Sequence, residues 1–324
     1  MPLEILLNSM VNRCVYVILA LSLVALPLSG IGQEATGCAS WYDPTSLFQV
    51  HQQDVPCLPT HKSESSVVFD ADQAVWSALE AERPAYWEVP LTFPGGAHTT
   101  VILHEFKAYR PELEIGHMTA NGVRTERYTP RLLSYRIAND DIHGSLVFLD
   151  GQVAGAIRYQ GVQYELGGLE CNERETGLFV LYATADALFT PAFECGLESL
   201  AEQVQVPQPM GLPNPLPSNP VTECVEIALD IDYFTYNQFG ADCNASVEWA
   251  LALLTGVSEI YQTELNDLIY LAASYINVWE TTDPYAAFTG NAGAMLDAFR
   301  LEWKNGELKQ VELSPLPEAI TGGA

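Results

Sequence analysis

The spacing of apolar residues differs between the two parts of the chain. Between residues 86 and 183, short runs alternate between apolar and polar positions, and three such runs at 145–166 are separated by Asp150-Gly151 and Gln160-Gly161. Asp-Gly is typical of a two-residue β-hairpin turn, because both turn positions need a positive φ. This part therefore predicts an antiparallel β-meander that forms a small sandwich or barrel.

After about residue 220 the pattern changes to alternating strands and helices. Apolar runs at 224–234 and 268–279 predict two strands, and a short helix is predicted at 292–305. The segment 244–265 repeats apolar residues at spacings of three and four, which predicts a long helix that Asp242 or Asn244 can cap. The order strand, helix, strand, helix predicts the beginning of an α/β unit with at least one parallel crossover.

Two further patterns complete the domain plan. A helix is predicted at 71–82, where Val75 and Leu79 lie on one side and Pro84 ends the pattern, and six prolines at 206–220 indicate an extended linker. The fold class is therefore α+β, with an antiparallel β-rich region followed by an incomplete α/β unit. The predicted divisions are a leader at 1–32, a loop-rich lead-in at 33–70, a β-rich domain at 71–205, the linker at 206–220, the α/β unit at 221–305 and a tail at 306–324.

The first 32 residues have the pattern of a secretory signal peptide. Arg13 precedes an apolar run at 14–26 that contains Ser22 as its one polar residue, and its 13 residues are fewer than the roughly 20 needed to span a bilayer. We therefore expect a secreted, extracellular product with no membrane attachment after signal cleavage.

Export permits disulfides among the six cysteines that follow the leader, and their pairing stays open. Cys38 and Cys57 are the easiest local pair. Cys224 begins a predicted strand and Cys243 begins the helix after it, so these two should lie at opposite ends of the α/β unit. That separation is too large for a disulfide, which needs its two Cα atoms within about 7 Å.

Charge limits the classes of partner. The chain has 14 Lys and Arg residues against 41 Asp and Glu residues, a formal net charge of −27. This excess argues against binding to nucleic acid and against docking on anionic membranes.

The amino-acid sequence of the α/β unit resembles that of a known family. The run 225–233 (VEIALDIDY), Ile260-Tyr261, and Val278-Trp279 followed by Asp283-Pro-Tyr are similar to the opening of a metzincin zinc endopeptidase, most closely the secreted adamalysin/reprolysin-like branch. The resemblance implies a precursor in which the β-rich region is a propeptide that contacts the catalytic domain. It also implies zinc as the cofactor of the complete family member, and protein or peptide substrates.

The zinc motif of that family is absent from this sequence. Metzincins bind zinc through His-Glu-x-x-His-x-x-Gly-x-x-His, whereas no histidine follows His143 here. The one His-Glu pair, His104-Glu105, has its next histidine at His117, thirteen residues on, so we interpret it as structural. We therefore expect a truncated, inactive precursor that has no catalytic residues of its own and binds no metal.

One cysteine has a possible regulatory role. Cys195 lies in a Cys-Gly pair just before the linker, and this context resembles the cysteine switch in which a propeptide thiolate occupies the catalytic zinc. The alternative is a structural disulfide, for example to Cys171.

Two carboxylate pairs, Asp230 with Asp232 and Asp140 with Asp141, are interpreted as solvated edges or turns, with calcium binding at the first pair as the alternative. At the level of the whole chain, the alternative function is a non-catalytic secreted β-sandwich protein that binds or inhibits a partner. Residues 221–324 alone should fold poorly, because a half-built parallel sheet leaves one edge uncovered.

Overall fold

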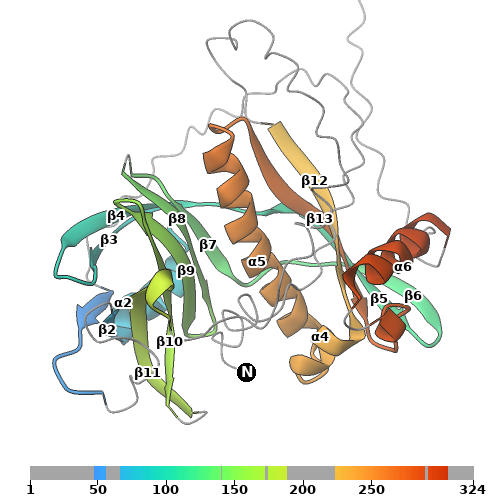
Figure 1. Ribbon diagram of the computed structural model, residues 1–324, viewed down its shortest axis with the longest axis horizontal. Helices are drawn as coiled ribbons and strands as arrows, with labels where there is room; N and C mark the ends of the chain where they lie inside the picture. The colour runs from blue at the N-terminus through green and yellow to red at the C-terminus, as the bar shows by residue number, and fades with distance from the viewer. Residues whose placement is uncertain are drawn as a thin grey trace, which may run out of the picture.

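The computed structural model describes residues 47–55, 66–139, 141–171, 174–187, 223–288 and 291–305. These residues form two β-sheets with a long helix between them (Figure 1). The description below covers these residues alone.

The larger sheet has nine antiparallel strands in the order β1-β2-β11-β10-β9-β8-β7-β4-β3. Its hairpin turns at Asp150-Gly151 and Gln160-Gly161 have positive φ at both positions, as the sequence predicted. The strands are β1 (Phe48–Val50), β2 (Ser66–Ala71), β3 (Tyr86–Thr92), β4 (His98–Glu105), β7 (Leu133–Ile137), β8 (Ile142–Leu149), β9 (Gln152–Tyr159), β10 (Val162–Cys171) and β11 (Arg174–Ala183).

This sheet curls around a single apolar core until β1 and β3, its two edge strands, lie near each other. The helix α2 (Gln73–Glu82) covers that core with Trp76 and Leu79, and Asp72 caps its first turn by accepting from the Ala74 amide at 2.9 Å. The predicted helix is therefore confirmed. One curled sheet takes the place of the two packed layers of a sandwich. Strands β7 to β11 follow one another in it as a continuous meander, whereas the chain leaves this sheet between β4 and β7.

The smaller sheet has four strands in the order β12-β13-β5-β6. Strands β12 (Glu223–Ile231), β13 (Ile269–Trp279) and β5 (Tyr109–Thr119) are parallel, and β6 (Gly122–Arg127) is antiparallel to β5. The helices of this unit are α4 (Tyr233–Gln238), α5 (Cys243–Glu264) and α6 (Ala292–Asn305), and short 3-10 turns occur at Thr184–Asp186 and Ala286–Phe288. The predicted order of strand, long helix, strand and helix after residue 220 is confirmed, and Asp242 is the N-cap of α5.

The partner of β13 on its second edge was not predicted. Strands β5 and β6 come from the region assigned to the β-rich domain, yet they extend the sheet of the α/β unit. In the whole chain β5 pairs with the edge of β13 that residues 221–324 alone would leave uncovered, so the poor folding expected of that fragment stays a prediction. An alternating pattern shows which face of a strand is buried, but it does not show which strand lies beside it.

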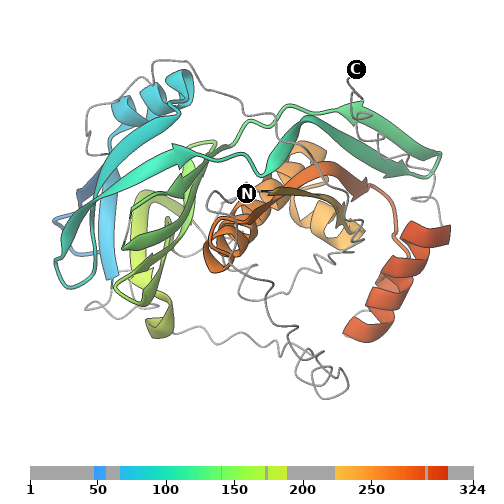
Figure 2. The same cartoon turned by 90° about the horizontal axis from the view of Figure 1, so that it is seen from above.

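Helix α5 lies between the two sheets (Figures 1 and 2). Leu251 and Leu254 belong to one apolar cluster that contains Ile276 and Val278 of the small sheet together with residues of the large sheet, such as Val147. The sequence predicted one apolar face for this helix, whereas in the structure residues of both sheets pack against the helix. In a separate cluster, α6 packs on the opposite face of the small sheet through Met295 and Phe299.

At this level the chain is an α+β protein, as predicted. No helix within the described segments combines the length and the apolar character needed to cross a bilayer.

Candidate functional site at the junction of the sheets

Several residues singled out from the sequence cannot be placed. Cys38, Cys57, Cys195 and Asp140 lie outside the described residues, so the predicted Cys38–Cys57 pair and the cysteine switch stay predictions. Cys224 and Cys243 both have free thiols, one at the start of β12 and the other at the start of α5.

The His104-Glu105 pair has a structural setting at the end of β4. The ring of His104 packs on Tyr86 with 3.9 Å between ring centroids, and burial, with the nearby Arg136 charge, lowers the pKa of its imidazole. Glu105 pairs with Lys107 at 2.9 Å. Both residues thus hold local structure, in keeping with the interpretation from the sequence.

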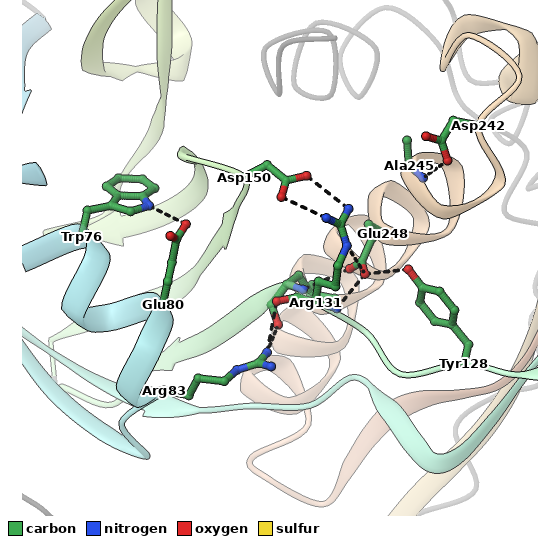
Figure 3. Close-up of polar contacts among 10 residues, drawn as sticks. Trp76, Glu80, Arg83, Tyr128, Arg131, Asp150, Asp242, Ala245 and Glu248 are labelled. Atoms are coloured by element: carbon green, nitrogen blue, oxygen red, sulfur yellow. Dashed lines mark hydrogen bonds and ion pairs between the residues drawn. The ribbon is translucent and has the colours of Figure 1, made fainter.

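A buried carboxylate connects α5 to the loop between β6 and β7. The side chain of Glu248 is fully buried, and its Oε1 accepts hydrogen bonds from the Tyr128 hydroxyl at 2.7 Å and from the Arg131 amide at 2.6 Å. Its Oε2 accepts from the Leu132 amide at 3.1 Å. Figure 3 shows Tyr128 and Arg131 converging on Glu248, while the Arg131 guanidinium reaches outward to Asp150.

This arrangement explains how a charged group is tolerated inside the junction. The guanidinium of Arg131 lies 3.8 Å from Glu248, and two backbone amides and one hydroxyl satisfy the carboxylate oxygens. Buried charges are tolerated when they are paired and fully hydrogen-bonded. Burial and the bond to Glu248 also raise the pKa of Tyr128, which keeps its hydroxyl protonated as a donor.

A second carboxylate network lies on the face of the small sheet that α6 covers. Asp230 on β12 accepts hydrogen bonds from Asn277 Nδ2 at 2.8 Å and Trp279 Nε1 at 2.9 Å, and a further short one from the Tyr285 hydroxyl. Burial raises the pKa of Asp230 to about 7, although these three donors lower it. The interpretation of Asp230 as a solvated edge residue is therefore wrong, because β13 and the segment after it supply its partners.

Asp232 has a different role from Asp230. Its side chain accepts from the Thr235 amide at 2.7 Å and caps the short helix α4. The two carboxylates therefore serve separate partners, and this arrangement favours structural roles over the calcium pair considered from the sequence.

The Asp230 network predicts a pH-dependent stability. The folded pKa of Asp230, about 7, lies above the usual value of 3.8, so folding favours the protonated form. The stability from this preference is complete below about pH 4 and is lost as the pH rises through 7. Between about pH 5.5 and pH 7.5 we expect the free energy of unfolding to fall by about 2 kcal/mol in the parent chain relative to Asp230→Asn.

Chemical denaturation of the parent, Asp230→Asn and the exposed control Asp297→Asn across this pH range measures the difference. Asparagine keeps an acceptor for Asn277 and Trp279 and offers an amide donor to Tyr285, so the variant should fold with a flatter pH profile. Equal pH slopes in the parent and Asp230→Asn would rule out Asp230 as the titrating group.

A third polar group lies on the opposite face of the small sheet, where α5 begins. His117 on β5 is buried, with 5% of its surface exposed. Its Nδ1 lies 2.5 Å from Glu280 Oε1, and its Nε2 lies 3.3 Å from Glu126 Oε1. One ligand atom each from His117, Cys243 and Glu280 lie within 4.8 Å of one another. In the described residues this is the group whose atoms are arranged to hold a metal ion.

The sequence analysis missed this group. It named His117 only as the next histidine after the His104-Glu105 pair, and it named Cys243 only when it argued against a disulfide to Cys224, because the residues lie far apart along the chain and follow no ligand spacing. Pairing of β5 with β13 brings them together, since it places His117 opposite Val278, two residues before Glu280. No local pattern could have signalled that contact.

The structure therefore holds three polar groups, namely Glu248 between the sheets, Asp230 on the face of the small sheet that α6 covers, and His117 with Cys243 and Glu280 where α5 begins. Comparison with known proteins found no protein-family model that matches the chain and no matching curated protein.

Proposed function

We propose that this chain is the precursor part of a secreted zinc-dependent endopeptidase, in which the β-rich region acts as a propeptide for the α/β unit. The resemblance of residues 225–285 to the metzincin opening suggests the class. The observation that carries the proposal is the pairing of β5, from the β-rich region, with β13 of the α/β unit.

Strand addition at a sheet edge is an established mode of protein recognition, with main-chain hydrogen bonds supplying affinity. Strand β5 runs parallel to β13 from Glu114 opposite Tyr275 to Met118 opposite Trp279. The hairpin also contributes Met118 to the apolar cluster beneath α6. A propeptide that adds strands in this way would cover an edge that the strand–helix–strand unit leaves open by itself.

The hydrogen bonds between Glu248 of α5 and the β-rich region support the same role. The helix carboxylate is satisfied almost entirely by groups of the β-rich region, namely the Tyr128 hydroxyl and the amides of Arg131 and Leu132. Without these donors, Glu248 would be a buried charge with its hydrogen bonds unmade. The α/β unit is therefore expected to need the β-rich region in order to fold.

Peptide-bond hydrolysis belongs to the family that this chain resembles, and the printed sequence lacks the zinc motif of that family. The role proposed for the chain itself is folding assistance and latency, with Cys195 as a candidate zinc ligand in the latent state. Protein or peptide substrates and export are part of the same proposal.

A cut-chain experiment tests the proposed role. A specific protease site is introduced into 206–220 of the full chain, and the chain is then cut and analysed by size-exclusion chromatography. We expect the two pieces to elute together, because β5–β13 pairing and the Glu248 bonds connect them. After denaturation and dilution, the piece beginning near residue 221 should regain its secondary structure only when the β-rich piece is present.

Either of two results would contradict the proposal. One is prompt separation of the pieces after cutting, and the other is cooperative refolding of the α/β piece by itself. Casein hydrolysis by the uncut chain would also count against a latent precursor, if a chelator abolishes that hydrolysis.

A further inference from the structure

We propose that His117, Cys243 and Glu280 bind a zinc ion that ties the β5–β6 hairpin to the α/β unit. The metal site itself rests on the geometry of these three residues. The further role of this ion, which is to hold the β-rich region on the α/β unit of the precursor, rests on the function proposed above. The sequence analysis expected no bound metal because it searched for histidine motifs along the chain, whereas this group forms through tertiary contacts.

The three side chains come from three different segments that meet at the start of α5. His117 lies on β5, Cys243 is the first residue of α5, and Glu280 directly follows β13. Their ligand atoms lie within 4.8 Å of one another, and the Nδ1 of His117 already lies 2.5 Å from Glu280 Oε1. Ligand atoms around a tetrahedral zinc are roughly 3–4 Å apart, given bond lengths of about 2.0–2.3 Å. Small side-chain shifts would therefore admit the ion.

Glu126 supports this reading from the other side of the imidazole. Its Oε1 lies 3.3 Å from His117 Nε2, the nitrogen that faces away from Glu280. Zinc-binding histidines usually donate their second N–H to a carboxylate, which fixes the ring orientation and strengthens the ligand. In the proposed site, Nδ1 binds the ion and Nε2–H donates to Glu126.

The buried ring of His117 also has one contact that the proposed site would improve. His117 is only 5% exposed, and its Nε2 is a buried atom without a hydrogen-bond partner of good geometry. A buried polar nitrogen left in this way costs free energy. An ion that reorients the ring and shortens the contact to Glu126 would remove that cost.

The types of ligand indicate which metal fits. Imidazole, thiolate and carboxylate together suit zinc, whereas magnesium and calcium prefer oxygen ligands alone. Three protein ligands leave a fourth position for water or another group.

The local charge also favours a cation. Glu280 and Glu126 both contact His117, and Asp242 directly precedes Cys243 as the N-cap of α5. The nearby Arg124 is already paired with Glu126. A zinc ion would place positive charge among these carboxylates, where it neutralises a carboxylate and stabilises a thiolate.

Cobalt(II) binding to the full chain tests the site. The reduced protein is stripped with EDTA, desalted and titrated with cobalt(II) while its absorption spectrum is recorded. We expect one equivalent to bind and to produce a thiolate-to-cobalt charge-transfer band that added zinc removes. Cys243→Ser should abolish the band, and Glu280→Gln should weaken cobalt binding by about tenfold or more.

Cys224→Ser is the matched control, because Cys224 is the other free and partly buried cysteine of the described residues and lies outside the group. Its cobalt spectrum should equal that of the parent. Circular dichroism checks that each variant is folded, and Glu280→Gln decides the result if Cys243→Ser misfolds.

Three results would overturn the site. They are no cobalt uptake by the parent chain, an unchanged band in folded Cys243→Ser, and unchanged cobalt affinity in Glu280→Gln. A disulfide at Cys243, found by mapping peptides of the unreduced chain, would overturn it as well. None of these results affects the association of the cut pieces, so a failed metal site and a failed propeptide role remain distinguishable.

Discussion

Replacing Glu248 by alanine is expected to lower the free energy of unfolding by about 3–5 kcal/mol, the usual cost of removing one partner from a buried, hydrogen-bonded charge network. Glu248 is fully buried, and it accepts from the Tyr128 hydroxyl and from the amides of Arg131 and Leu132. Truncation to alanine leaves these donors facing a cavity. Denaturant unfolding of the full chain measures the change.

The control for this prediction is Glu264→Ala, on the last turn of the same helix. Glu264 is exposed, and within the described part of the chain it makes a long surface ion pair with Arg158, at 3.4 Å. Surface pairs of this kind contribute roughly 0–1 kcal/mol. Comparable losses of unfolding free energy in the two variants would show that the buried hydrogen bonds of Glu248 stabilise the fold no more than an exposed ion pair does.

Introducing a methyl group at Gly116 is expected to disrupt the pairing of β5 with β13. A Cβ atom at this position would lie 1.7 Å from the hydroxyl oxygen of Tyr275 and 2.6 Å from its Cζ. Tyr275 is 1% exposed and packs edge-on against Trp303, so its ring has little room to move. We expect Gly116→Ala to lower the free energy of unfolding by about 3 kcal/mol, at the upper end of the usual cost of overpacking.

A double-mutant cycle tests that mechanism. Tyr275→Leu removes the aromatic ring together with the clashing Cζ and hydroxyl, so Gly116→Ala should be less harmful in that background, with a coupling of at least about 1 kcal/mol. Gly293→Ala serves as the control, because its Cβ would meet only Asn291 Oδ1 at 3.8 Å. Additive effects of the two substitutions would show that contact with Tyr275 is not the cause.

Local patterns predicted most of the individual elements. The helix expected at 244–265 spans Cys243–Glu264 and begins at the Asp242 cap, and the strand expected at 268–279 spans Ile269–Trp279. These features depend on residues within a few turns of one another, namely helical spacing and capping groups. The hairpin turn at Asp150-Gly151 follows from local backbone geometry in the same way.

The candidate site was much less predictable. His117 was given no role of its own, Asp230 was expected to be solvated, and Glu248 was not considered. Each of these residues takes its role from a partner more than forty positions away, such as Glu280 for His117 and Tyr285 for Asp230. Side-chain chemistry along one strand does not reveal which distant donor or acid will face it.

By itself, then, the sequence determined the α+β class, the long helix with its cap, the parallel crossover and the hairpins of the meander, because short-range spacing and turn geometry specify them. The tertiary structure alone decided that β5 pairs with β13, that α5 is buried between two sheets, and that His117, Cys243 and Glu280 meet. The physical reason is that strand partners are selected by the total burial and hydrogen bonding of the folded chain. An alternating pattern specifies a buried face, and it leaves the neighbour open.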